Sequence, residues 1–195
     1  LYVCTNLGAW DRRSLPDATR DFIGAFYQFS DDVERELAAA VPAAYEVLSV
    51  RCGDHCYDDP AAQVPAGSRR RIDSLIERHI VPRRQVPIVV TSDCHALKLD
   101  LARRYGMLTL PHQSRHGAFG HVRPVALDLC LLKHSRFNYH INAWADWWSG
   151  FSHYTSMIFR IPSMNFRAPR YEREEVTAQG QLLTARRWWR AFARG

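Results

Sequence analysis

The strongest constraint on the fold is a series of short apolar runs separated by longer segments with helical periodicity. Strand-like runs occur at residues 45–50, 87–91, 107–110 and 137–142. The clearest helical face has apolar positions three and four residues apart, at Ile72, Leu75, Ile76, His79 and Ile80. Short apolar strands that alternate with amphipathic helices are typical of a parallel sheet with helices on both faces. We therefore predict an α/β, Rossmann-like fold.

Polar residues at the expected helix ends support this order. Ser30 precedes a helix-forming run with acidic residues in its first turn, and Ser68 precedes the next helix. Ser92 or Asp93 can cap a third helix, which Gly106 closes. Further helices are expected at residues 125–133 and 152–159 and in the tail from residue 171 onward.

Composition fits a folded protein and excludes several classes of function. The chain has 195 residues, of which 47% are hydrophobic, and a chain of this size buries roughly 70% of its unfolded surface. The net charge is +6, but the arginines form separate clusters and no zinc finger, RNA-recognition signature or basic zipper is present. We therefore expect no nucleic-acid partner. No apolar window approaches the roughly 20 residues of a transmembrane segment.

The cysteines indicate reduced thiols rather than a disulfide framework. There are five, an odd number, scattered through apolar segments. This favours a cytoplasmic location, with a lumenal or membrane-associated one, through a missing N-terminal part, as the alternative. Cys52, His55 and Cys56 lie close together, but no second cysteine pair follows to complete a zinc site, so we predict no metal.

The predicted fold places a ligand site beyond the carboxyl ends of its strands. In open α/β sheets ligands bind at this edge, where loops lead into helix N-termini. These ends fall at residues 51–54, 92–93, 112–120 and 142–152, which hold many of the unusual polar side chains. Neither GxxxxGKS/T nor GxGxxG is present, so a phosphate would be held by other groups.

Arg51 and a short serine- and glycine-containing element are the candidate phosphate ligands. Arg51 ends a strand and offers a planar fork of donors for phosphate oxygens. The element Ser149, Gly150, Phe151 and Ser152 offers hydroxyls and a helix N-terminus. Together they would form a diphosphate clamp without metal. The alternative is that Arg51 pairs with Asp54 and that Ser152 only caps a helix.

Four motifs in order resemble one enzyme family. Residues 47–54, VLSVRCGD, resemble the HVRRGD-type motif of inverting, GDP-fucose-dependent fucosyltransferases related to bacterial and animal α1,2- and α1,6-fucosyltransferases. Residues 88–93, IVVTSD, are similar to their strand ending in TDD or ND. Residues 126–135, ALDLCLLKHS, resemble the DLxLLSxC helix, and residues 149–152, SGFS, resemble the SSFS element. The resemblance extends over roughly residues 47–162.

The resemblance implies a metal-independent glycosyltransferase of the two-domain GT-B class. Its donor would be a GDP-sugar, with GDP-fucose favoured, and its acceptor a carbohydrate. The resemblance also implies that Arg51 neutralises the diphosphate and that Asp93 or Asp128 contacts guanine or ribose. Ser149, Gly150, Phe151 and Ser152 would wrap phosphate and base, although residues 143–148 are an alternative match for this element. Two positions differ from the family: Ser49 stands where a histidine is usual, and Cys52 where a second basic residue is usual.

An inverting transfer needs a base that accepts the proton of the acceptor hydroxyl. Asp54, His55, His112 and His116 are candidates because they lie in the strand-end loops, and Asp54 and His116 are the first choices. Arg115 is a candidate second cation for the phosphate. From the residues alone, the alternative is that each of these is an ordinary loop residue whose side chain pairs with its neighbours.

The motif positions predict how the chain is divided. Residues 1–45 would be a lead-in strand and helices, residues 46–165 the nucleotide-sugar-binding domain, and residues 166–195 a C-terminal helical segment. Because the first motif comes early and the sequence begins at Leu1, we expect the donor-binding half of a larger enzyme. A non-catalytic nucleotide-sugar or carbohydrate-binding domain of the same fold is the main alternative.

Overall fold

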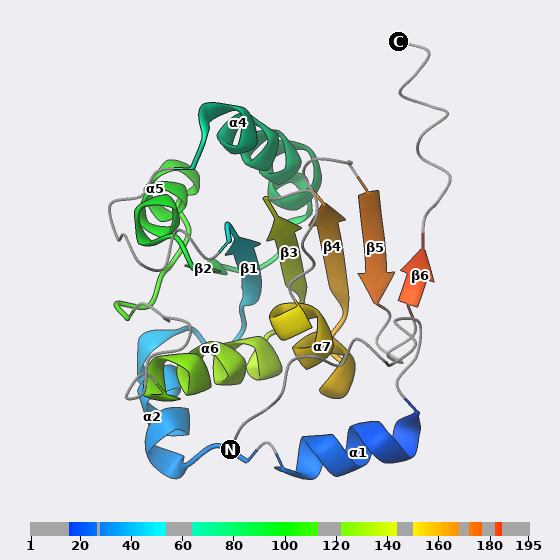
Figure 1. Cartoon of the computed structure of the whole chain (residues 1–195). Coiled ribbons are helices and arrows are strands. Elements are labelled where there is room, and N and C mark those ends of the chain that lie inside the picture. The colour runs from blue at the N-terminus through cyan, green and yellow to red at the C-terminus, as the bar shows by residue number, and fades with distance from the viewer. Residues whose placement is uncertain are drawn as a thin grey trace.

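The protein is built on one six-stranded sheet with the strand order β2-β1-β3-β4-β5-β6 (Figure 1). The computed structural model describes residues 16–26, 28–53, 64–112, 122–143, 150–167, 172–176 and 182–184. The parallel strands are β1 (Glu46–Arg51), β2 (Ile88–Ser92), β3 (Asn138–Asn142) and β4 (Ser163–Arg167). The antiparallel strands are β5 (Glu172–Val176) and β6 (Leu182–Thr184). The α/β, Rossmann-like prediction is confirmed.

The chain reverses its direction of travel across the sheet between β1 and β3. From β1 it passes through α4 (Ala66–Leu75) to β2 on one side. It then returns through α6 (Val122–His134) to β3, which lies on the other side of β1. At the carboxyl ends of these two strands Arg51 is the register partner of Asn142. This is the topological switch point, where open α/β sheets bind their ligands.

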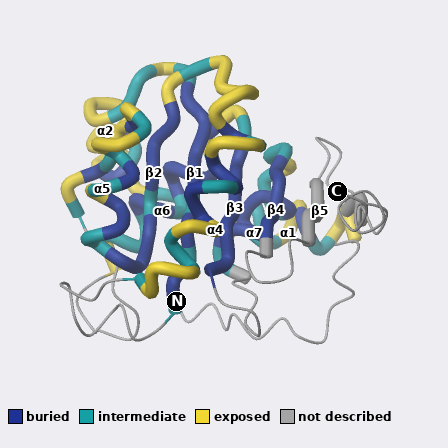
Figure 2. The backbone as a smooth tube through the Cα atoms, turned by 90° about the horizontal axis from the view of Figure 1, so that it is seen from above, coloured by how far each residue is buried: buried dark blue, intermediate teal, exposed yellow. Residues whose placement is uncertain are grey.

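Helices cover both faces of the sheet, and Figure 2 shows its central strands buried between them. On one face Leu48, Val90 and Ile141 belong to an apolar cluster with α4, the π-helical turn η1 (Ile76–Ile80) and α5 (His95–Tyr105). On the other face Val47 and Val89 pack with α2 (Asp31–Ala40) and α6. The remaining elements are the 3-10 turn η2 (Val81–Arg83), α7 (Gly150–Ile158), which contacts β3 and β4, and α1 (Asp17–Phe26), which contacts α7.

Several predicted elements are confirmed, and two are wrong. Two predicted helix caps are also wrong, because Ser68 lies inside α4, and Cys94 instead of Ser92 or Asp93 is the N-cap of α5. Apart from His79, the predicted apolar face of α4 and η1 is buried, and Gly106 closes α5 in the left-handed conformation with φ 59°. Residues 107–110 do not form a strand, because only Leu108 makes a bridge, to Val89 of β2. The tail does not form a helix at residues 172–176 and 182–184, where β5 and β6 extend the sheet instead. Residues 172–176, EREEV, are almost all charged, so no apolar period separated helix from strand there.

A row of buried polar side chains, which we call the α7 seam, joins α7 to β3 and β4. It consists of Asn138, His140, His153, Ser156 and Asn165. The Ser156 hydroxyl lies 3.1 Å from Nε2 of His140 and accepts a hydrogen bond from Asn138 at 3.0 Å. The Asn165 amide lies 3.0 Å from Nδ1 of His153. Oriented hydrogen bonds therefore dock much of this helix on the sheet.

The α7 seam predicts acid sensitivity. Burial, reinforced by the neighbouring His153, lowers the pKa of His140 to about 3, whereas an unfolded histidine titrates near 6.5. Because the unfolded chain binds this proton first, the stabilisation is complete above about pH 6.5 and is lost as the pH falls towards 3. We expect urea unfolding between pH 6.5 and 5 to show a slope of up to about 1.4 kcal/mol per pH unit from this residue. His140→Gln should flatten the slope, and an unchanged slope would contradict the prediction.

Candidate functional site

Asp93 ties the carboxyl ends of β1 and β2 together. It follows β2 directly, and its side chain lies next to the chain that leaves β1. Its Oδ1 accepts a hydrogen bond from the backbone N–H of Cys52 at 2.7 Å, and its Oδ2 accepts one from Gly53 at 2.9 Å. Two amides at the end of a parallel strand, which would otherwise need water or a ligand, are thereby satisfied within the protein.

The same carboxylate orients Arg51. Nε of Arg51 lies 3.2 Å from Oδ2 of Asp93, and the arginine side chain is 22% exposed while that of Asp93 is 2% exposed. Burial raises the pKa of Asp93, an effect that the Arg51 charge and the two backbone N–H groups oppose. The site therefore holds a partly exposed guanidinium against a buried carboxylate, directly at the switch point.

A second group of polar side chains lies on the α6 side of β2. Oδ1 of Asp128 accepts a hydrogen bond from the hydroxyl of Thr91 at 3.2 Å and lies 3.0 Å from Nε2 of His112. Thr91 lies within β2, two residues before Asp93, which follows the strand. The Arg51–Asp93 pair and the His112–Asp128 pair thus both lie near the carboxyl end of β2.

Lys98 supports the chain segment that carries His112. This α5 side chain is only 3% exposed, and its ammonium donates hydrogen bonds to the carbonyl oxygens of Leu110, at 3.0 Å, and His112. Burial lowers the pKa of Lys98, and the nearby Asp128 charge opposes this shift. The sequence analysis missed this residue. The available signal was a lysine on the apolar stripe of a helix, between Leu97 and Leu101.

Of the predicted site residues, the structure pairs Arg51 with Asp93, and it pairs Asp128 with His112 beside Thr91 of β2. The expected alternative partner of Arg51, Asp54, lies outside the described residues, and so do His55, Arg115, His116 and Ser149. The described part of the chain shows that Arg51 pairs with Asp93.

The predicted phosphate element continues into α7. Gly150 is the first residue of this helix. Ser152 is 4% exposed, and its carbonyl oxygen accepts a hydrogen bond from Ser156 at 3.0 Å. Phe151 is partly buried against the apolar cluster on the α6 face. Ser152 therefore points into the protein, and it does not cap the helix, because α7 already begins at Gly150.

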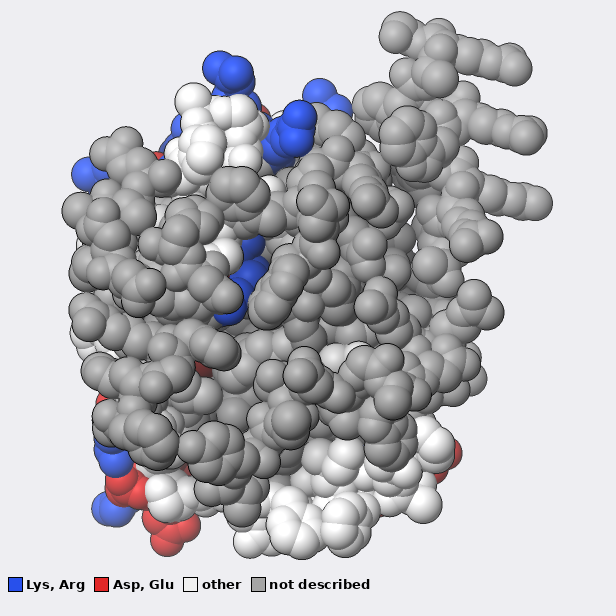
Figure 3. Space-filling view, in the orientation of Figure 1, with Lys and Arg blue, Asp and Glu red and all other residues white. Residues whose placement is uncertain are grey.

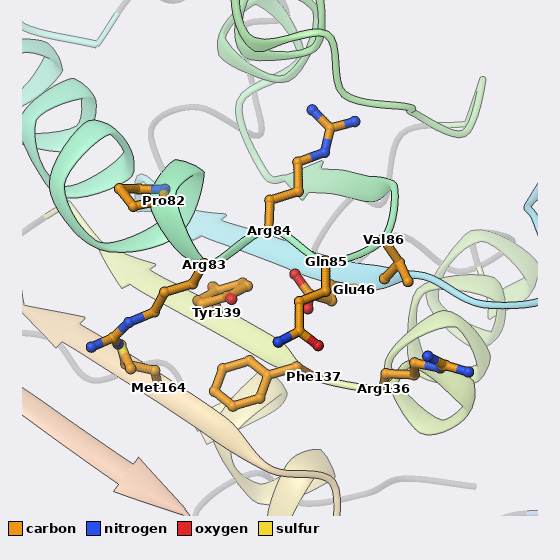
Figure 4. Close-up of a pocket in the computed structure, with 10 residues that line it drawn as sticks. All are labelled: Glu46, Pro82, Arg83, Arg84, Gln85, Val86, Arg136, Phe137, Tyr139 and Met164. Atoms are coloured by element: carbon orange, nitrogen blue, oxygen red, sulfur yellow. The ribbon is translucent and has the colours of Figure 1, made fainter.

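A separate pocket of about 740 Å³ lies at the opposite, amino-terminal edge of the sheet. Its lining includes Glu46, Arg83, Arg84, Arg136 and Phe137 (Figure 4). Figure 4 shows that the three guanidinium groups point in different directions rather than toward one centre. Arg84 donates hydrogen bonds to backbone oxygens at the carboxyl end of α5, and Arg83 donates one to the sulfur of a methionine. These arginines do not converge as an anion site requires.

Charge on the molecular surface is divided among several patches. Figure 3 shows Asp and Glu atoms gathered over α2, while Lys and Arg atoms lie in separate patches on this face. The acidic residues of α2 are Asp31, Asp32, Glu34 and Glu36. The described residues therefore present both signs of charge on this face.

Comparison with protein-family models, with curated proteins and with solved structures gave no match. In the described segments, no helix has both the length and the apolar character needed to cross a bilayer.

Removing Asp93 should destabilise the protein. Asp93→Ala leaves two buried N–H groups without acceptors and removes the partner of Arg51, so the free energy of unfolding should fall by about 2–4 kcal/mol. Asp93→Asn, which keeps one acceptor oxygen, should cost less. The measurement is urea unfolding at pH 7, with Asp21→Asn on the exposed surface of α1 as the control, expected to cost under about 1 kcal/mol. Equal losses in Asp93→Ala and the control would contradict this reading.

Proposed function

We propose that the protein is a metal-independent inverting glycosyltransferase that transfers a sugar, with fucose favoured, from a GDP-sugar to a carbohydrate acceptor. The observation that carries the proposal is the position of Arg51, at the carboxyl end of β1, at the switch point and held by Asp93. The resemblance of residues 47–54 to a fucosyltransferase motif supports the same role. The described chain would form the donor-binding domain, with GDP-sugar and acceptor as its partners.

Arg51 would act on the leaving group. Negative charge builds on the diphosphate as the glycosidic bond breaks, and a fixed guanidinium stabilises it without reorganising. Asp93 supplies this fixation, because a buried carboxylate with two backbone hydrogen bonds cannot easily turn away. The start of α7 at Gly150 would contribute N–H groups to the same anion.

His112 is the base candidate that the described residues support best. A carboxylate on one ring nitrogen stabilises the imidazolium that forms when the other nitrogen takes a proton, and Asp128 lies 3.0 Å from Nε2 of His112. Lys98 would position the histidine through its backbone oxygen. In this proposal Asp93 and Asp128 orient other side chains, so neither needs to contact guanine or ribose.

A non-catalytic nucleotide-sugar-binding domain is the second candidate. The ion pair with Asp93 offsets part of the Arg51 charge, and Ser49 and Cys52 replace the histidine and the second basic residue of the resembling motif. Both candidates predict GDP binding. Transfer to an acceptor, or donor hydrolysis above background, in the presence of EDTA would eliminate the second candidate.

Donor binding should depend on Arg51. We expect calorimetry to show GDP binding that is at least ~10-fold weaker in Arg51→Ala, because a charge-assisted bidentate contact is lost. Arg51→Lys keeps the charge beside Asp93 but loses the planar fork, and should be intermediate. Arg103→Ala on the exposed face of α5 is the matched control. Absence of GDP binding to the parent protein, or equal binding by Arg51→Ala, would overturn the proposal.

A further inference from the structure

Three side chains with metal-ligand chemistry meet between α2 and α6. Cys130 and His134 are four residues apart on α6 and so lie on one face of that helix. Glu34 faces them from α2, which packs against α6 in the lower left of Figure 1. One ligand atom from each of the three lies within 4.8 Å of the others. We call this group the α2–α6 cluster.

We propose that the α2–α6 cluster binds a zinc ion or a divalent cation of similar softness. The thiolate of Cys130, an imidazole nitrogen of His134 and a carboxylate oxygen of Glu34 would be the three protein ligands. Cysteine, histidine and glutamate together are a zinc ligand set, and a three-ligand site leaves the fourth position to water.

The three ligand atoms are already nearly as close to one another as they would be around a bound zinc ion. Zinc–ligand bonds of about 2.0–2.3 Å place tetrahedral ligand atoms about 3.3–3.8 Å apart. Nε2 of His134 already lies 2.9 Å from Oε2 of Glu34. Modest side-chain rotations within the 4.8 Å limit would complete the arrangement.

The partial exposure of two of the ligands would let an ion reach the cluster from solvent. Cys130 is fully buried, whereas the side chains of Glu34 and His134 are 36% and 43% exposed. The site would therefore lie at the rim of the helix interface, with the sulfur on its inner side.

Lys133 is the group that opposes a cation here. Its ammonium lies 3.7 Å from Oε1 of Glu34. It also lies over the rings of Phe29 and Phe159, at 5.1 and 5.6 Å from their centres, and these contacts can hold it when the carboxylate turns to a metal. Removing the charge of Lys133 should strengthen metal binding, an effect that a purely structural ion pair would not produce.

The first test measures zinc binding to the full chain by competition with a chromophoric chelator. We expect one zinc per chain at the cluster, with affinity at least ~10-fold weaker in Glu34→Gln and in His134→Gln. Glu36→Gln, an equal loss of charge on α2 outside the cluster, is the matched control and should change little. Lys133→Gln should bind about three- to tenfold more tightly. No zinc binding, or equal affinity in Glu34→Gln and Glu36→Gln, would overturn the proposal.

The second test uses Co²⁺ as a spectroscopic probe of the sulfur ligand. The parent protein should show thiolate-to-cobalt charge transfer in the near ultraviolet, and Cys130→Ser should abolish it. Cys56→Ser, which removes a different thiol, should leave it unchanged. A band that survives in Cys130→Ser and disappears in Cys56→Ser would place the ion at the other cysteines and overturn the assignment. Neither test uses GDP, so its outcome is independent of the proposed transferase activity.

Discussion

The strand-end site depends on the buried carboxylate of Asp93. Its two oxygens receive the backbone N–H groups of Cys52 and Gly53, and its charge faces Arg51. Parallel strands are hydrogen-bonded along their length, but the residues beyond their ends have no such partners. Asp93 therefore holds the chain beyond the last hydrogen bond between β1 and β2. The direction of the Arg51 side chain, and thus any role it has toward an anion, follows from this contact.

The alternation of side chains along the strands explains why the polar groups collect on one face. Ser49 is paired with Thr91 on one side and His140 on the other, and His140 is paired with Asn165. Register partners leave a sheet on the same side, so these residues form one polar row across four strands. The row lies on the face covered by α6 and α7, which also carries the apolar side chains of Val47 and Val89. The candidate site and the α7 seam therefore lie next to each other along this row of polar residues.

Sequence patterns were sufficient for the parallel core and for the edge of the candidate site, because apolar periodicity and strand ends are local properties. They were insufficient where contacts join distant segments. The pairing of Arg51 with Asp93 instead of Asp54 depends on the lateral packing of β1 and β2. The burial of Lys98 and the approach of Glu34 to Cys130 depend on how helices meet. In residues 172–176 the charged composition hid strand β5, which is defined by its neighbour β4.

The α7 seam also sets the position of its helix along the sheet. An apolar interface tolerates a slide of a helix by a fraction of a turn, because one methyl group can replace another. Hydrogen bonds such as those from Asn138 and Asn165 tolerate no such slide, since each needs its partner within about 3 Å. Helix α7 is consequently locked in axial register against β3 and β4. Its first residue, Gly150, is thereby held in a fixed position relative to these two strands.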